Sequence, residues 1–428
     1  MNTKYQPPRI EDYEPLVGAE TVGRILKKAE TLKGFHVANI NSTYNGGGVA
    51  ELLSPLTLLL NGLGIQAGWR LLQGTPDFFG ITKRMHNALQ GMDFNFTPLK
   101  RQIYESVIFQ NSLFNHFKRD HFDMIIVHDP QPLPLIAHYR KQCPWVWRCH
   151  IDLTDGHRKL WDYLSGFINQ YDAVIFSTRE SARKTKPPQL FSLPAIDPFS
   201  TKNRELSKKE MDGRLAHYKI PTDLPIIAQV SRFDRWKDPL GVIEAFKLAR
   251  RKVDSTLVLL GNFASDDPEG AKIYESLLAH RDERILILPN GDDTALVNTI
   301  QTRAAIILQK STREGFGLTI TEAMWKGTPV IAGNVGGIRR QIQNGVNGYL
   351  VSSVEDCAHR IVELLKNRRL RKRIGRAGKE SVRQKFLMPR FLEEHLDLFS
   401  SFESSFRHVG CCARSTWSPE QKNYFARE

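Results

Sequence analysis

The stretch Arg313–Ala323, REGFGLTITEA, decides how the rest of the chain is interpreted. It follows the apolar run Ala304–Leu308, which predicts a buried strand of a parallel sheet, and it then opens into a predicted helix. Gly315 and Gly317 let the backbone pass close to a bound group, and the helix N-terminus offers unpaired N–H donors. The pattern therefore predicts a ligand site at the carboxyl end of a strand, where open α/β sheets bind their ligands.

Two glutamates frame this stretch. Glu314 lies on the predicted loop, and Glu322 lies about a turn and a half into the predicted helix. Carboxylates accept hydrogen bonds from hydroxyls, whereas backbone amides suit an anion, so a ligand with both sugar and phosphate fits. The alternative is one glutamate that closes a helix start and a second on a solvated face. This stretch alone leaves both interpretations open.

A second strand–turn–helix unit lies upstream, at Pro225–Pro239. Asp238 is a good N-cap with Pro239 at the first helical position, so Arg232 and Lys237 are expected in the loop before that helix. Two fixed cations at this edge of a sheet suit a pyrophosphate or a leaving phosphate. Ordinary loop charge is the alternative, and the glutamate stretch in the same half of the chain makes it less attractive.

The first half opens with a predicted strand at Phe35–Ile40, a glycine-rich turn and a leucine-rich helix at Val49–Asn61. The turn holds three consecutive glycines, Gly46, Gly47 and Gly48. The spacing is not G-x-G-x-x-G and no acidic residue follows at the right distance, so a nicotinamide site is disfavoured. Three glycines together indicate close approach to a ligand, or a loop that closes over one.

Two later predicted strands end in His128-Asp129 and His150-Ile151-Asp152. The carboxyl ends of parallel strands face the ligand-binding edge of a sheet. The alternative is that these residues cap the following helices, and Asp152 or Asp155 is expected to cap the helix over His157–Gln170. His150 has no such role, which makes it the better candidate for a ligand contact.

The totals limit the class of protein. At 428 residues, with 41% hydrophobic and 25% charged residues, the chain is long enough for two α/β domains. No apolar run approaches the roughly 20 residues that span a bilayer, and the N-terminus lacks the apolar core of a signal peptide, so we expect a cytoplasmic protein without a membrane partner. The five cysteines have no metal-ligand spacing, and no metal site is expected.

The net charge of +14 comes partly from the basic run Lys366–Arg376. Apolar residues alternate with the charges at helical spacing, which favours a solvated helix face over nucleic-acid binding. An anionic small substrate fits this balance, and no nucleic-acid partner is expected.

The second half resembles the retaining GT-B glycosyltransferases. Glu314 and Glu322 around Gly-Phe-Gly look like that family's E-x7-E motif, and Arg232 with Lys237 looks like its phosphate-binding pair. The runs at 329–338 and 344–351 are also similar. The resemblance implies an α/β GT-B fold of two Rossmann-like domains facing across a deep crevice. The expected domains are residues 1–196 for the acceptor and 197–389 for the nucleotide-sugar donor, with a helix in 390–428 packing back on the first.

The first half narrows the resemblance to the trehalose-synthesising branch, on the four stretches Asn41–Glu51, His86–Gly91, Val127–Pro132 and Trp147–Asp152. That branch implies transfer of glucose from ADP- or UDP-glucose to glucose with retention, in a reversible reaction that forms trehalose. The related trehalose phosphorylase, which converts trehalose and phosphate to glucose 1-phosphate and glucose, is the alternative. A catalytically silent sugar-nucleotide-binding regulator is the alternative of another class. The intact motif residues argue against it.

The resemblance also implies a role for each motif residue. Arg232 and Lys237 would hold the diphosphate, Glu322 would accept the ribose hydroxyls, and Glu314 would hold hydroxyls of the donor glucose. His150 would face the reacting sugar. The remaining expected contacts are Asp129 to the acceptor glucose, the amides of Gly315, Phe316, Gly317 and Leu318 to the donor glucose, and Gly46, Gly47 and Gly48 to the phosphates or the acceptor.

Neither glutamate is left as an evident nucleophile, so we expect front-face substitution, in which a phosphate oxygen takes the acceptor's proton. His150, Arg232, Lys237 and Glu314 are the expected catalytic residues. No cofactor is expected to be obligatory, although Mg²⁺ carried by the nucleotide is compatible with the site. The expected partners are the nucleotide-glucose, glucose and trehalose, and whether the chain forms a homodimer is left open, as is the nucleotide base.

Overall fold

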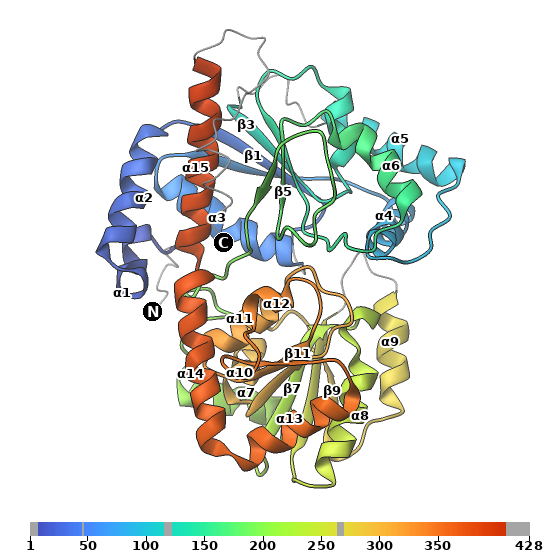
Figure 1. Ribbon diagram of the computed structural model, residues 1–428, viewed down its shortest axis with the longest axis vertical. Helices are drawn as coiled ribbons and strands as arrows, with labels where there is room; N and C mark the ends of the chain where they lie inside the picture. Colours follow the sequence, from blue (N-terminus) through green and yellow to red (C-terminus); the bar gives the residue numbers. More distant parts are fainter. Residues whose placement is uncertain (1–6, 45–46, 115–121, 263–268, 408–428) are drawn as a thin grey trace. The chain divides into compact units, whose positions relative to one another are not determined.

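The computed structural model describes residues 7–44, 47–114, 122–262 and 269–407 (Figure 1). The chain divides into two compact units, residues 1–195 with 388–428 and residues 196–387. Each unit is built on a six-stranded sheet whose paired strands all run parallel. The predicted α/β class with two parallel-sheet domains is therefore confirmed.

The sheet of the first unit has the strand order β2-β1-β3-β4-β5-β6. Its strands are β1 (His36–Asn41), β2 (Gln66–Leu71), β3 (Met124–His128), β4 (Trp145–Arg148), β5 (Ala173–Phe176) and β6 (Gln189–Phe191). Every residue of β3, β4 and β5 is buried, as expected for central parallel strands covered by helices on both faces.

The helices of the first unit are η1 (Ile10–Tyr13), α1 (Glu14–Val17), α2 (Ala19–Thr31), α3 (Gly48–Gly62), α4 (Pro76–Leu89), α5 (Pro98–Phe114), η2 (Leu133–His138), α6 (Arg158–Ile168) and α15 (Met388–Arg407). The last of these returns from the far end of the chain and packs against α2 and α3 (Figure 1). Its Phe399 ring stacks on Phe35 at the start of β1, with centroids 5.1 Å apart.

One local expectation for this unit is wrong. Neither Asp152 nor Asp155 caps α6. His157 does so, because its Nδ1 accepts a hydrogen bond from the Leu160 amide at 3.3 Å.

The sheet of the second unit has the strand order β12-β11-β10-β7-β8-β9. Its strands are β7 (Ile226–Arg232), β8 (Thr256–Asn262), β9 (Ile285–Pro289), β10 (Ile306–Gln309), β11 (Val330–Gly333) and β12 (Tyr349–Val351). The strand predicted at Ala304–Leu308 is β10, and all of its residues are buried.

The helices of the second unit are α7 (Lys208–His217), η3 (Arg235–Lys237), α8 (Pro239–Arg250), α9 (Glu269–Leu278), α10 (Thr294–Arg303), α11 (Leu318–Trp325), α12 (Ile338–Gln341), α13 (Val354–Lys366) and α14 (Arg368–Lys385). Asp238 caps α8 through a bond from the Gly241 amide at 3.1 Å, with Pro239 at the first position, as the sequence predicts. Arg232 is the last residue of β7 rather than a loop residue.

The order of the strands places the predicted site residues at sheet edges. Asp129 and His150 follow the ends of the adjacent strands β3 and β4, and Glu314 follows β10, which pairs with β7, the strand that Arg232 ends. Among the helices that the structure describes, none is long and apolar enough to cross a bilayer.

Candidate active site

Lys237 and Glu314 meet in the second unit, although 3₁₀ segment η3 and the loop after β10 are far apart in the chain. The Lys237 ammonium donates to the Glu314 carboxylate, and the Ser311 hydroxyl donates to the same oxygen at 3.3 Å. The Lys237 side chain is 16% exposed and that of Glu314 is 11% exposed. The structure thus brings the predicted phosphate-binding residue, Lys237, into contact with the predicted sugar-binding residue, Glu314, at the edge of the sheet.

Arg232 lies two residues before the cap of η3. Its guanidinium pairs with Asp234 at 3.3 Å, and the buried Asp234 carboxylate also accepts from the Trp236 amide at 2.9 Å. The backbone of η3 is itself fixed to β7, because the Gln229 side chain on that strand donates to the Lys237 carbonyl at 2.7 Å. Arg232 therefore projects from the end of β7, and Lys237 projects from a turn whose backbone is fixed to that strand.

The loop between Glu314 and α11 is fixed through its backbone carbonyls. The Gly337 amide donates to the Glu314 carbonyl at 3.2 Å, and the Gln341 side chain donates to the Phe316 carbonyl. Gly317, which precedes α11, has a φ of 88°, a left-handed conformation that favours glycine. The absence of a side chain at Gly317 also leaves room for Glu314, because a Cβ there would lie 3.2 Å from Glu314 Cγ.

Glu322 lies inside α11 and is only 1% exposed. Its carboxylate pairs with Lys202 at 3.1 Å and accepts from the Gln301 side chain at 3.0 Å. Burial raises the pKa of Glu322, and the nearby Lys202 and Lys326 outweigh it, so its pKa lies below the usual value. Protein groups therefore already occupy the Glu322 carboxylate.

In the first unit, Asp129 and His150 are joined directly. Asp129 has a φ of 62°, and its carboxylate accepts from the His150 amide at 2.8 Å. The His150 ring meets His128, with Nε2 3.0 Å from His128 Nδ1, and the two rings stack with centroids 5.3 Å apart. His128 in turn lies 3.1 Å from Asn39 Oδ1 on β1.

Burial sets the protonation of this group. Desolvation raises the pKa of Asp129 to about 7, against the lowering effect of the His150 amide and of Arg148. Desolvation, followed by the charge of Arg148, holds the pKa values of His128 and His150 well below the usual histidine value. Both rings are therefore neutral near pH 7, and Asp129 titrates in that range.

The glycine turn is described only in part, because Gly46 lies outside the described residues. Gly47 precedes α3 with extended backbone and Gly48 is the first residue of that helix. A Cβ at Gly47 would meet only Thr43 Oγ1, at an ordinary 3.8 Å. At Gly47, contacts with the described part of the protein therefore do not require the absence of a side chain.

Four polar residues contact predicted site residues but are not themselves predicted. Asn39 and His128 belong to the group around His150, and Lys202 and Gln301 contact Glu322. Asn39 had a signal, since it is an amide inside an apolar strand, and such a residue needs a buried partner. His128 lies in the stretch Val127–Pro132 at a strand end, where the sequence favours its neighbour Asp129 as the ligand contact. Lys202 and Gln301 reach Glu322 from distant segments, and no local pattern marks them.

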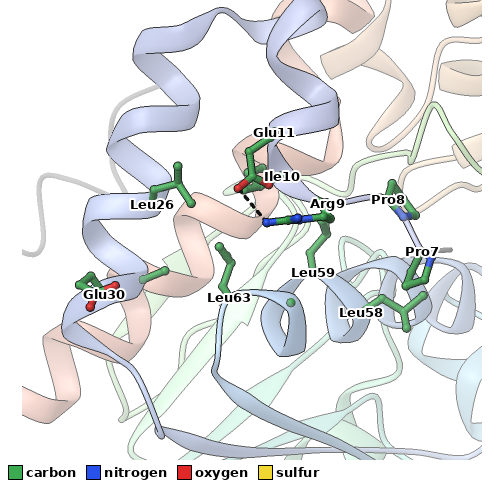
Figure 2. Close-up of a pocket in the computed structure, with 12 residues that line it drawn as sticks. Pro7, Pro8, Arg9, Ile10, Glu11, Leu26, Glu30, Leu58, Leu59 and Leu63 are labelled. Carbon is green, nitrogen blue, oxygen red and sulfur yellow. Dashed lines mark hydrogen bonds and ion pairs between the residues drawn. The ribbon is translucent and has the colours of Figure 1, made fainter.

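A pocket of about 260 Å³ lies elsewhere in the first unit, between the segment 7–11 and helices α2 and α3 (Figure 2). Leu26, Leu58, Leu59 and Leu63 line it, and the Arg9–Glu11 ion pair, 3.5 Å long, lies at its side. It contains none of the predicted site residues.

Within the described ranges, His, Cys, Asp and Glu side chains form no group of three or more that could hold a metal ion.

Two family descriptions match this chain. Residues 39–183 match "Trehalose synthase, N-terminal domain", and residues 214–381 match "Glycosyl transferases group 1". The first match covers the first sheet except β6 and the start of β1, and the second covers the whole second sheet. Together they include every predicted site residue.

Curated relatives resemble nearly the whole chain. It is 41% identical over 401 residues to the trehalose synthase of Pyrococcus horikoshii, which covers 92% of this chain and 96% of the relative. It is 29% identical over 399 residues to the trehalose phosphorylase of Pleurotus pulmonarius, which covers 80% of this chain but 54% of the phosphorylase.

The fold resembles solved glycosyltransferase structures. The sucrose-phosphate synthase of Thermosynechococcus elongatus superimposes with a TM-score of 0.67 at 17% identity, over 87% of this chain and 100% of that chain. This likeness concerns the fold alone. Together with the two family matches, it confirms the predicted α/β GT-B fold.

Proposed function

Because the chain belongs to the trehalose synthase family of GT-B glycosyltransferases, we propose that this hexosyltransferase uses a nucleoside diphosphate glucose as its donor and free glucose as its acceptor. The product is trehalose, and the configuration of the transferred glucose is retained. The observation that carries this proposal is the 41% identity to a trehalose synthase across both units. The Lys237–Glu314 contact beside Arg232 supplies the chemistry at the donor side.

At the donor side, Lys237 and Arg232 bind the diphosphate. As the bond between the glucose C1 and the phosphate oxygen breaks, negative charge grows on the leaving group, and two cations, one at the end of β7 and one on η3, stabilise it. Each such fixed donor contributes about 3 kcal/mol to the transition state in comparable sites. Glu314, held by Lys237 and Ser311, accepts from hydroxyls of the donor glucose, and the amides of Gly315 to Leu318 line the same loop.

The reaction proceeds on one face of the donor sugar. The acceptor's C1 hydroxyl attacks the donor C1 from the side that the diphosphate leaves, and an oxygen of the departing phosphate takes the hydroxyl proton. One C–O bond breaks and one forms, so the products are trehalose and the nucleoside diphosphate. The same steps in reverse consume trehalose, which makes the reaction reversible.

At the acceptor side, Asp129 binds the acceptor glucose and His150 contacts the reacting sugar. The glycines 46–48 supply backbone contacts to the phosphates or the acceptor. The bond between the Asp129 carboxylate and the His150 amide supports this assignment, since it holds both side chains at the ends of adjacent strands.

Glu322 is proposed to accept the ribose hydroxyls of the nucleotide. Because Lys202 and Gln301 hold its carboxylate, ribose reaches it only when the Lys202 ammonium moves aside or joins the contact. No cofactor is obligatory in this proposal, and a Mg²⁺ ion that accompanies the nucleotide is compatible with it.

Trehalose phosphorylase activity is the second candidate, and the 29% identity to such an enzyme favours keeping it. In that reaction inorganic phosphate would take the place that the proposal gives to the diphosphate, at Arg232 and Lys237. The two activities therefore use the same cations and differ in the presence of a nucleotide.

One assay separates the candidates. The protein is incubated with glucose and ADP-glucose or UDP-glucose, and separately with glucose and glucose 1-phosphate, and a non-reducing disaccharide is measured. Product from the nucleotide donors alone supports the proposal. Product from glucose 1-phosphate alone identifies a phosphorylase, and no product from either pair identifies a silent sugar-nucleotide-binding protein or another acceptor.

A further inference from the structure

We propose that Asn39 and His128 are positioning residues, which hold the His150 ring in a single neutral tautomer so that its Nδ1 accepts a hydrogen bond from a substrate hydroxyl. This inference rests on the proposed contact of His150 with the reacting sugar. It adds two residues to the site and the direction of one hydrogen bond.

The three side chains form a linear relay from strand β1 through β3 to the end of β4. Asn39 Oδ1 lies 3.1 Å from His128 Nε2, and His128 Nδ1 lies 3.0 Å from His150 Nε2. Asn39 is 1% exposed and His128 is 2% exposed, whereas His150 is partly exposed. Only the last member of the relay is therefore open to a ligand.

The direction of each bond follows from the first. An amide oxygen can only accept, so His128 Nε2 carries a proton and donates it to Asn39. A neutral imidazole carries one proton, so His128 Nδ1 is an acceptor and His150 Nε2 donates to it. The remaining nitrogen of His150, Nδ1, is then left with a lone pair.

The surroundings keep both rings neutral, as this chain of donors requires. Arg148 is the last residue of β4, two residues before His150. Burial lowers the pKa values of both rings most, and the charge of the buried Arg148 guanidinium lowers them further. His395 on α15 acts in the same direction. Asp129 is the carboxylate of this group, and it holds the His150 amide rather than the ring.

The tautomer of His150 is measurable without activity. It tests the directions of the hydrogen bonds in the relay, whereas the kinetic variants below test whether the tautomer serves the reaction. Wild-type protein labelled with [15N]histidine is compared with His150→Asn to assign the His150 ring, and the two-bond 1H–15N pattern identifies the protonated nitrogen. We expect the proton on Nε2 near pH 7. A proton on Nδ1, or on both nitrogens, overturns the proposal.

Asn39→Asp provides the functional test. Its kcat/KM is measured at several pH values and divided by the kcat/KM of wild type at the same pH. The new carboxylate still accepts from His128 Nε2 but raises the pKa of His128. Below that pKa both His128 nitrogens carry protons, so His128 donates to His150 Nε2 and moves the His150 proton to Nδ1. The ratio should then fall about tenfold for each pH unit below the raised pKa.

Asn41→Asp is the matched control, because it places the same charge on the same strand beside Trp69, whose indole donates to Asn41. Its ratio should stay flat with pH. A flat ratio for Asn39→Asp, or an equal acid fall for Asn41→Asp, contradicts the proposal. If no variant or wild type makes trehalose, the proposed function fails, and the tautomer measurement still decides whether the relay is correct.

Discussion

Lys237 carries most of the proposed chemistry at the scale of a single residue. Its ammonium contacts Glu314 and lies on a turn fixed to β7, so it needs little rearrangement to meet a diphosphate. We predict that Lys237→Met lowers kcat by about 100-fold or more, since one preorganised donor is lost from the transition state. Steady-state rates with the nucleotide-glucose donor measure this.

Lys310→Met is the matched control for that variant. Lys310 also pairs with a carboxylate, that of Asp238, and its side chain is 12% exposed, close to the 16% of Lys237. It should cost stability but change kcat by no more than a few-fold. If the two variants lose equal activity, the leaving-group role of Lys237 is incorrect.

Asp129 makes a prediction about pH at the same scale. Burial raises its pKa from 3.8 to about 7, so the folded protein binds a proton that the unfolded chain has released between those values. The contribution of Asp129 to stability therefore falls as pH rises from about 4 to about 7. Asp129→Asn lacks this titration. The free energy of unfolding of the variant, relative to that of wild type, should therefore increase as pH rises from about 4 to about 7.

Urea unfolding of both proteins at several pH values between 5 and 8 checks this expectation. Curves for wild type and Asp129→Asn that run parallel from pH 5 to 7 would show that Asp129 is not desolvated as described. A gain confined to pH above 8 would point to another group.

The loop that leads into α11 is the element on which the donor site depends. Gly317 has a φ of 88°, and a Cβ there would also lie 3.3 Å from Glu314 Cδ. Gly317→Ala should cost about 1 kcal/mol of stability through the left-handed backbone. It should also displace the Glu314 carboxylate and lower kcat/KM.

Gly345→Ala separates the two effects. Gly345 has a similar φ of 78°, but a Cβ there meets nothing within 4 Å. Both variants should lower the unfolding midpoint, and only Gly317→Ala should lower kcat/KM, by about tenfold for one weakened hydrogen bond. Equal kinetic effects of the two would exclude a role for the Glu314 position.

At the scale of the whole molecule, α15 ties the end of the chain to the first unit. Lys28 on α2 pairs with Glu393 at 3.0 Å and with Asp397 at 2.7 Å, and its side chain is 27% exposed. Lys28→Met should destabilise the first unit by about 1 kcal/mol, because a partly exposed pair is worth little more. Amide exchange should accelerate in β1–β6 and stay unchanged in β7–β12.

Arg250→Met supplies the reverse case in the second unit. Arg250 pairs with Asp282 at 3.0 Å between α8 and the start of β9. Its loss should accelerate exchange in β7–β12 alone. Uniform acceleration by either variant would mean that the two units unfold together.

The sequence predicts what local patterns determine. The strand β10 and the Asp238 cap of α8 each follow from a few neighbouring residues, and the structure has them. The positions of Asp129 and His150 after the ends of two strands could also be predicted, and the structure adds that these strands, β3 and β4, pair with each other.

Contacts between distant segments could not be predicted in the same way. Lys202 and Gln301 enclose Glu322 only because the chain after residue 196 and α10 pack on α11, which no local periodicity encodes. The His128–His150 contact depends on the side-chain directions at two strand ends.

The most direct measurement of the central claim is the stereochemistry of transfer from a nucleotide donor. ADP-glucose and UDP-glucose labelled with 13C at C1 of the glucose are each incubated with unlabelled glucose, without phosphate, and the products are followed by 13C NMR. We predict a non-reducing disaccharide with the label at an α-anomeric carbon, and one nucleoside diphosphate released for each disaccharide. A label at a β-anomeric carbon, or product that forms only when glucose 1-phosphate replaces the nucleotide, would contradict it.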